Sequence, residues 1–259
     1  MAINGRNYGT SGPNLQYEER SQAPTSSKTL NLGKVFGIMF IWLLFTAGIA
    51  FGGGYAFYVW MTSDMEAASS GLLATLVVSG ITLLILTFVI QFWALRRDKG
   101  MVVLSSLYVL CMGLLCSSFV LFIDWRILGV AFGITSAIFG VLAIIGLLAK
   151  NVRPIAMVGF MVLFGSLMVT LITWLASLRI QVDARLLWIL DFAIFGAMLL
   201  LIIVDMNRIG QICESGEMSK NLTLFCALTL YTDFVYIFIK IVYFSNFTDD
   251  IQFWFKQVE

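Results

Sequence analysis

The chain has 259 residues, of which 60% are hydrophobic and 12% are charged, and its net charge at pH 7 is +1. A soluble domain has about half apolar and about a quarter charged residues, so this composition indicates an integral membrane protein and excludes an ordinary soluble domain. The small net charge gives no indication of nucleic-acid binding. The absence of histidine excludes imidazole catalysis and the most common zinc ligand.

Residues 1–32 are rich in Gly, Ser, Asn and Gln and contain almost no apolar run. Such a segment cannot bury enough apolar surface to offset the entropy of ordering, so we expect a mobile polar N-terminal tail. It lacks the pattern of a cleaved signal peptide, and we expect the first apolar run to remain in the membrane.

Seven apolar runs follow this tail, and each is long enough to cross about 30 Å of hydrocarbon at about 1.5 Å per residue. Their length, together with only three prolines in the chain, favours helices over the short alternating strands of a barrel. We therefore predict an all-α membrane protein, a bundle of seven transmembrane helices in one domain at residues 33–245. The predicted helices cover residues 34–60, 72–95, 101–123, 127–149, 154–178, 186–205 and 221–243.

The charges of the loops predict the orientation, because cytoplasmic loops are enriched in Lys and Arg. Eleven basic residues lie on the side of the N-terminus: Arg6, Arg20, Lys28, Lys34, Arg96, Arg97, Lys99, Lys150, Arg153, Arg208 and Lys220. Four lie on the other side: Arg126, Arg179, Arg185 and Lys256. We expect the N-terminus in the cytoplasm and, after seven crossings, the C-terminus outside.

Three further features give local expectations. Gly129 and Gly133 have the spacing of close helix contacts in membranes, although ordinary tolerance of glycine in lipid is an equal alternative. Residues 246–259 mix aromatic and charged residues, and we expect a short interfacial C-terminal tail. The four cysteines have no metal or redox spacing, so we expect them to pack as small apolar residues, with Cys213 in a loop.

An acid near the middle of the last run, Asp233, is the first candidate functional residue. An ionisable group at membrane depth costs several kcal/mol unless it is paired or faces water. A second acid, Asp205, closes the preceding run, where a hydrated helix end beside Arg208 is the alternative interpretation. If both carboxylates meet in a dry setting, they cannot readily both ionise, and they would share one proton. When ionised, they would form a weak transit site for Ca²⁺, which prefers six to eight oxygen ligands.

The predicted helices place these two acids at different depths. Asp205 lies at the cytoplasmic end of its helix, whereas Asp233 is about 12 residues, or roughly 18 Å, from the same face. A direct pair therefore requires the last helix to begin before residue 221 or the sixth helix to tilt.

Two more charged residues lie inside the runs. Asp191 is fourteen residues before Asp205, near four helical turns, so it is a possible pore-lining residue, with a solvated position at the outer interface as the alternative. Lys240 lies seven residues beyond Asp233, and we expect its side chain to extend outward to the interface rather than to line a pore.

Four motifs resemble those of the Bax inhibitor family of transmembrane proteins. Residues 227–238, A-L-T-L-Y-T-D-F-V-Y-I-F, resemble the signature of its last helix, and residues 204–209, V-D-M-N-R-I, resemble its aspartate motif. Residues 133–140, G-I-T-S-A-I-F-G, resemble its fourth helix, and residues 92–97, F-W-A-L-R-R, the basic end of its second. The similarity follows the same order through the seven-helix portion.

This resemblance implies a seven-helix fold with a pH-sensing aspartate pair and a calcium leak. By motif position the pair is Asp205 and Asp233. The resemblance also implies a basic latch at the end of the second helix, for which Arg96 and Arg97 are the candidates, although the register could equally favour Leu95. The family is further associated with suppression of cell death in eukaryotes and with membrane-protease interaction in some bacteria.

The leading functional hypothesis is a pH-sensitive calcium leak channel that carries Ca²⁺ and responds to protons, with no tightly bound cofactor. The alternative is a non-conducting regulator that binds other membrane proteins, such as a protease. An enzyme is not expected, because no histidine is present to activate a serine or cysteine. Short loops and the lack of a targeting signal favour a bacterial plasma membrane over a eukaryotic endomembrane. The expected contacts are the lipid bilayer and one membrane-protein partner, without nucleic acid.

Overall fold

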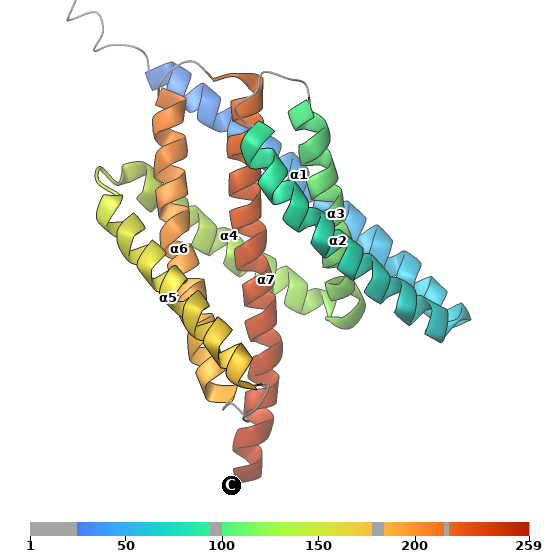
Figure 1. Cartoon of the computed structure of the whole chain (residues 1–259). Coiled ribbons are helices and arrows are strands. Elements are labelled where there is room, and N and C mark those ends of the chain that lie inside the picture. The colour runs from blue at the N-terminus through green and yellow to red at the C-terminus, as the bar shows by residue number, and fades with distance from the viewer. Residues whose placement is uncertain (1–24, 94–99, 178–183, 215–217, 259) are drawn as a thin grey trace, which may run out of the picture.

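The computed structural model describes residues 25–93, 100–177, 184–214 and 218–258, and these residues form seven α-helices and no strand (Figure 1). The helices are α1 (Thr25–Ser63), α2 (Met65–Trp93), α3 (Gly100–Phe122), α4 (Trp125–Leu148), α5 (Arg153–Ser177), α6 (Ala184–Glu214) and α7 (Lys220–Val258). Each is long and apolar enough to cross a membrane. The predicted all-α, seven-helix fold is confirmed.

The outer surface of the bundle is apolar. Large side chains such as Phe45, Phe88 and Met161 are more than half exposed, and similar residues cover the outer faces of α1 to α5. A surface of this kind suits hydrocarbon, where a helix satisfies its backbone hydrogen bonds internally. The protein is therefore a multi-pass integral membrane protein.

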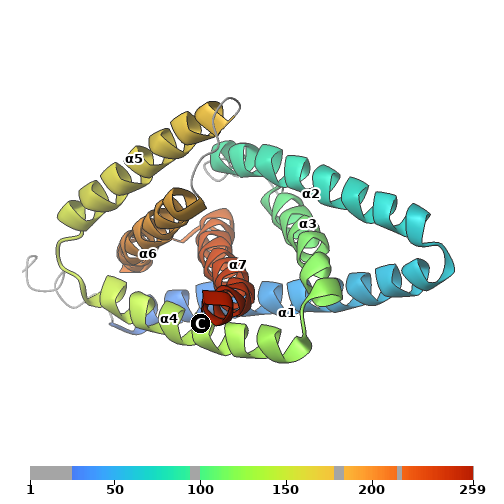
Figure 2. The same cartoon turned by 90° about the horizontal axis from the view of Figure 1, so that it is seen from below.

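The central element of the bundle is α7, which lies among the other helices when the molecule is viewed along its length (Figure 2). It packs against α1, α3, α4 and α6, while α2 packs on α3 and α5 packs on α6. Several α7 side chains are fully buried, among them Leu230, Tyr231 and Ile237. A central helix of this kind can carry polar side chains that face protein rather than lipid.

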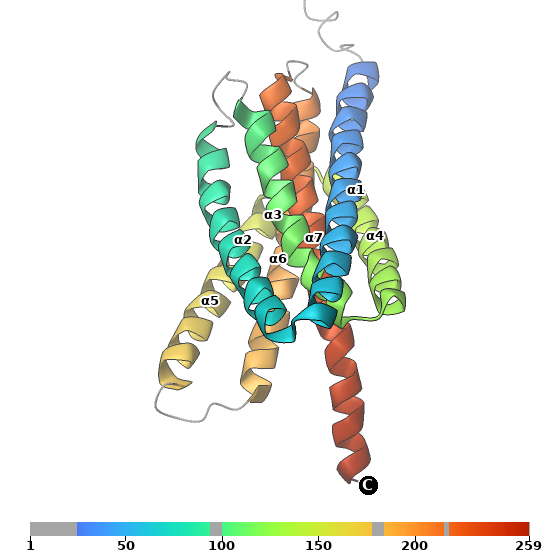
Figure 3. The ribbon, with the colours of Figure 1, turned by 90° about the vertical axis from the view of Figure 1, so that its right-hand side faces the viewer.

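The beginning of α1 and the end of α7 lie at opposite ends of the bundle (Figure 1). We call these the N-terminal end and the C-terminal end of the bundle. The beginning of α7 and the end of α6 also lie at the N-terminal end. At the other end, α7 extends beyond the remaining helices (Figure 3).

The helix boundaries differ from the predicted ones most clearly in α6. This helix ends at Glu214, nine residues beyond Asp205, where the sequence predicted its end. Cys213, predicted to lie in a loop, is therefore in the last turn of α6, and all four cysteines are buried, as expected. The apolar run marks where the hydrocarbon ends, whereas the helix continues into the polar layer.

Helical structure also enters the segments that the sequence predicted as tails. The first helix begins at Thr25, within the predicted polar tail, and the last helix continues to Val258. Residues 1–24 lie outside the described part of the chain, and the mobility of the N-terminal tail stays a prediction.

Helices α4 and α6 approach each other closely at Gly146. A Cβ atom added at Gly146 would lie 2.6 Å from the carbonyl oxygen of Ile203 and 2.6 Å from the Cβ of Met206. By contrast, a Cβ at Gly129 or Gly133 would meet no atom within 4 Å. The helix contact predicted from the spacing of these two glycines is therefore wrong for the described residues.

Candidate ion site between helices α2, α3, α6 and α7

The two acids are brought to similar depths by the length of α6. Asp205 lies nine residues before the end of α6 at Glu214, which corresponds to about 13 Å along the helix. Asp233 lies thirteen residues after the start of α7 at Lys220, or about 20 Å. The remaining difference is roughly 6 Å instead of the 18 Å expected from the predicted boundaries. No early start of α7 is needed.

Asp205 and Asp233 line the same cavity, which has a volume of about 200 Å³. Four helices form its walls, and more than half of the wall residues are polar. The polar neighbours of the two acids are Thr87 and Gln91 of α2, Tyr108 of α3, and Thr229 and Thr232 of α7. Thr229 and Asp233 are four residues apart on α7, so the helical period places them on one face. The structure thus brings together the two acids that the sequence singled out.

Asp233 is the more enclosed of the two acids. Its side chain is 8% exposed, and its Oδ2 atom is buried without a hydrogen-bond partner among the described residues. Asp205 is half-buried and close enough to Asp233 for the two charges to interact. Arg208, one turn further along α6, is exposed and is an opposite charge that acts on Asp205. An unpartnered buried carboxylate oxygen is costly and is typical of a site that binds a proton or a ligand.

The walls of the cavity offer several oxygen ligands. Two carboxylates, the hydroxyl groups of its walls and the amide of Gln91 are the oxygen ligands that hard cations prefer. Within the described ranges, no group of three or more His, Cys, Asp or Glu side chains comes together to hold a metal ion.

Each acid lies two residues from a hydrogen bond that fixes its helix to a neighbour. On α7, the hydroxyl groups of Tyr231 and Thr46 of α1 are hydrogen-bonded at 2.6 Å, and Tyr231 is fully buried. The ring of Tyr231 also packs edge-on against Trp42 and Tyr108. These contacts fix α7 against α1 and α3 directly before Asp233.

On α6, the corresponding anchor is Asn207. Its amide donates hydrogen bonds to the carbonyl oxygens of Gly146, at 3.0 Å, and Ala149, at 2.6 Å, and these carbonyls are at the end of α4. Gln211 donates to the Asn207 Oδ1 atom at 2.8 Å. Sequence reasoning missed this anchor, although a buried Asn next to a candidate acid was a visible signal.

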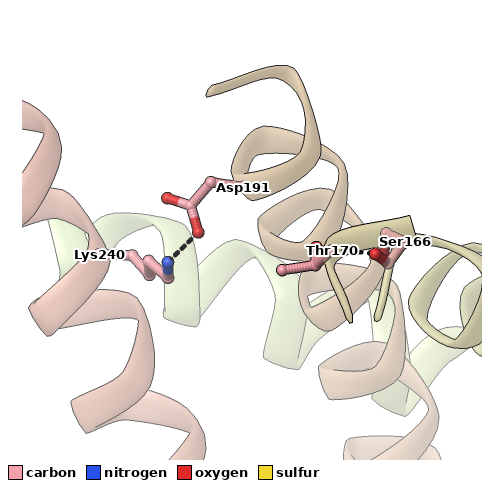
Figure 4. A network of polar contacts seen from close by, with 4 residues as sticks. All are labelled: Ser166, Thr170, Asp191 and Lys240. Atoms are coloured by element: carbon pink, nitrogen blue, oxygen red, sulfur yellow. Dashed lines mark hydrogen bonds and ion pairs between the residues drawn. The ribbon is translucent and has the colours of Figure 1, made fainter. Parts of the chain in front are cut away.

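Figure 4 shows a second pair of charges, Asp191 and Lys240. It lies nearer the C-terminal end of the bundle, because Lys240 is seven residues beyond Asp233 along α7. Lys240 of α7 donates a hydrogen bond to the Asp191 Oδ1 atom of α6, and both residues line a second cavity of about 380 Å³. The bond from Thr170 to the Ser166 carbonyl in the same view is local to α5. For Asp191 the sequence left open a pore-lining position and a solvated position at the outer interface; the structure places it in a cavity separate from that of Asp205, and a pore-lining role stays a prediction.

The positions of Asp191 and Lys240 in their apolar runs could have predicted this ion pair. Asp191 lies five residues from the outer end of its predicted run, and Lys240 lies three residues from the outer end of the next run. Consecutive runs are antiparallel, so these opposite charges are at similar depths. The lysine predicted to extend alone to the interface therefore has a partner.

Arg96 and Arg97, the latch candidates, lie outside the described residues. The last α2 residue in the cavity wall is Gln91, five residues before Arg96. The latch stays a prediction.

The family model described as inhibitor of apoptosis-promoting Bax1 matches residues 29–250, which include all of the acids discussed above. The chain belongs to the Bax inhibitor family. Comparisons with curated proteins and with solved structures give no match. The family resemblance of the four sequence motifs is thereby confirmed.

Proposed function

We propose that this Bax inhibitor family protein is a pH-sensitive calcium leak channel whose ion path passes Asp205 and Asp233. The observation that supports this proposal is the shared cavity of about 200 Å³, which joins two acids from different membrane helices. A structural role alone would not require two acids to meet at membrane depth, where each charge is costly.

The size of the cavity is compatible with a partly hydrated Ca²⁺ ion. A volume of about 200 Å³ has room for several water molecules. Ca²⁺ takes six to eight oxygen ligands, and two carboxylates offset its charge while hydroxyl, amide and water oxygens complete the shell. So few carboxylates favour weak binding, as transit through a leak path requires.

The pH response is proposed to arise from the two carboxylates acting as one proton-binding unit. Their charges interact, and one of them is enclosed, so protonation of the pair removes the negative charge that attracts a cation. Among the described neighbours, α3 contributes Tyr108 and α6 contributes the exposed Arg208, while the α2 wall residues Thr87 and Gln91 are uncharged. Arg96 or Arg97 is the proposed latch. On the predicted orientation, Asp205 lies in the cytoplasmic half.

Calcium flux into dye-loaded proteoliposomes tests this proposal. We expect Asp233→Asn to change the flux by roughly tenfold, which corresponds to about 1.4 kcal/mol in the barrier, and to remove its dependence on pH. Asp124→Asn is the matched control, because Asp124 caps α4 outside the cavity and Asn is an equally good cap. The proposal is wrong if Asp233→Asn leaves both flux and pH response as in the Asp124→Asn control.

The alternative of a non-conducting regulator is favoured by a different observation. An apolar groove of about 630 Å³ lies among α1, α3, α4 and α7, and it reaches Gly129, where no side chain fills the space. A transmembrane helix of a partner protein could pack there, since small residues allow close approach. Under this alternative, wild-type protein shows no calcium flux, and Gly129→Leu, which fills the groove, abolishes capture of a membrane-protease partner.

A further inference from the structure

The two cavities that contain charged residues lie between the same three helices. The cavity of Asp205 and Asp233 has walls from α3, α6 and α7, with α2 as a fourth wall. The cavity of Asp191 and Lys240 also has walls from α3, α6 and α7. Along α7 the two sites are seven residues, or about 10 Å, apart. The two separate cavities therefore follow one another along the length of α7.

A polar stripe on α7 connects the two cavities. Thr229, Asp233, Tyr236 and Lys240 are spaced by four, three and four residues, and this spacing places them on one helical face. Tyr236 lies between the two sites, and its hydroxyl is buried without a hydrogen-bond partner among the described residues. The charge of Asp191 acts on this hydroxyl, so Tyr236 is near the second cavity as well.

The ion pair of Lys240 and Asp191 leaves one carboxylate oxygen without a hydrogen bond among the described residues. Lys240 binds the Asp191 Oδ1 atom, but Oδ2 is buried and has no partner within the described part of the chain. The Lys240 ammonium group also lies 5.6 Å from the centre of the Tyr243 ring, which adds a cation–π contact. The positive charge is thus held in the cavity by an acid and an aromatic ring. A fixed ammonium group there repels a cation, whereas the carboxylate alone would attract one.

We propose that the Lys240–Asp191 ion pair closes the C-terminal end of the cation path, and that Tyr236 separates it from the Asp205–Asp233 cavity. This inference rests on the proposed function, because it adds a closure at the C-terminal end of the same cation path, in addition to the proposed latch at Arg96 or Arg97. It gives Lys240 and Asp191 opposite effects on flux: the lysine blocks cations, and the aspartate holds the lysine while attracting cations itself.

Two single substitutions test the sign of these effects in Ca²⁺-dye proteoliposomes. We expect Lys240→Met to raise the calcium flux by roughly tenfold, because it removes the positive charge and keeps the length of the side chain. We expect Asp191→Asn to lower the flux, because it leaves the positive charge of Lys240 without its neutralising carboxylate in the second cavity. Lys220→Met, at the exposed start of α7, is the matched control and should leave the flux unchanged. A purely structural ion pair would shift both variants in the same direction or neither, and either result overturns the inference.

The double variant Asp191→Asn/Lys240→Met covers the case in which Lys240→Met does not fold. Removing one partner leaves a half-buried charge alone, whereas replacing both with neutral residues is often tolerated. We expect the calcium flux of the double variant to exceed that of the wild type, because the second cavity then contains no positive charge. A flux at or below the wild-type value would contradict the inference.

The rate of thiol labelling at position 236 tests whether the ion pair blocks access from the C-terminal end, and this assay needs no calcium. In a chain whose native cysteines are replaced, Tyr236→Cys should react slowly with a membrane-impermeant methanethiosulfonate added from the C-terminal side. Adding Lys240→Met should speed this reaction several-fold, and an unchanged rate would show that the ion pair closes nothing. If wild-type protein carries no calcium but labelling still depends on Lys240, the proposed function fails and the closure stands. If Asp233→Asn alters the calcium flux but Lys240→Met changes neither the flux nor the labelling rate, the proposed function stands and the inferred closure is wrong.

Discussion

The crossing of α4 and α6 at Gly146 predicts a stability effect that can be worked out from the structure. In Gly146→Ala, the new methyl group would meet the Ile203 carbonyl oxygen and the Met206 Cβ at 2.6 Å, so the helices must separate by about 0.8 Å to restore ordinary contact. Both neighbouring atoms belong to the backbone or to a Cβ and cannot rotate away. Overpacking of this kind costs about 1–3 kcal/mol, against which alanine gains about 1 kcal/mol in helix propensity.

Gly140→Ala on the same helix is the matched control, because a Cβ there meets nothing within 4 Å. It receives the propensity gain without the clash, so we expect the free energy of unfolding of Gly146→Ala to be lower than that of Gly140→Ala by about 1–3 kcal/mol. Thermal unfolding in detergent, followed by tryptophan fluorescence, measures the difference. Because Met206 follows Asp205 directly, the calcium flux of Gly146→Ala should fall as well. Equal melting temperatures would refute the close contact between α4 and α6.

Two further predictions concern the anchors beside the acids. Tyr231→Phe should lower the free energy of unfolding by about 1 kcal/mol through loss of the hydrogen bond to Thr46, whereas Tyr243→Phe, which is half exposed, should have little effect in the same unfolding assay. Asn207→Leu should cost about 1–3 kcal/mol, because it leaves two carbonyl oxygens at the end of α4 without their donor, and it should also reduce calcium flux. Gln211→Ala is its control, and an equal loss in both would contradict the role given to Asn207.

The seven helices could be predicted from the sequence because hydrocarbon imposes a simple rule on length and hydropathy. The same rule singled out Asp233, since an acid within an apolar run needs a reason. It failed at the end of α6, which continues nine residues past Asp205 to Glu214. Hydropathy reports where the hydrocarbon ends, whereas a helix ends where its backbone hydrogen bonds stop. That difference produced the apparent depth mismatch between the two acids.

Contacts between helices could not be predicted in the same way, because they depend on how each helix is rotated about its axis. Gly129 and Gly133 had the expected spacing, yet a Cβ atom at either position would meet no atom within 4 Å. Gly146 has no glycine four residues away on either side, yet it lies at a close contact between α4 and α6. The pairing of Asp191 with Lys240 required both a matching depth and a matching face, and the sequence contained only the depth.

The position of α7 explains how this helix can carry both Asp233 and Lys240 within its membrane span. A helix surrounded by α1, α3, α4 and α6 can direct charged side chains at protein, whereas an outer helix would expose them to hydrocarbon. Both charged contacts of α7, through Asp233 and through Lys240, are made with α6. A displacement of α6 along α7 would therefore change the separation of the two acids and of the ion pair together. The hydrogen bonds of Asn207 to the end of α4 oppose such a displacement and so hold both separations fixed.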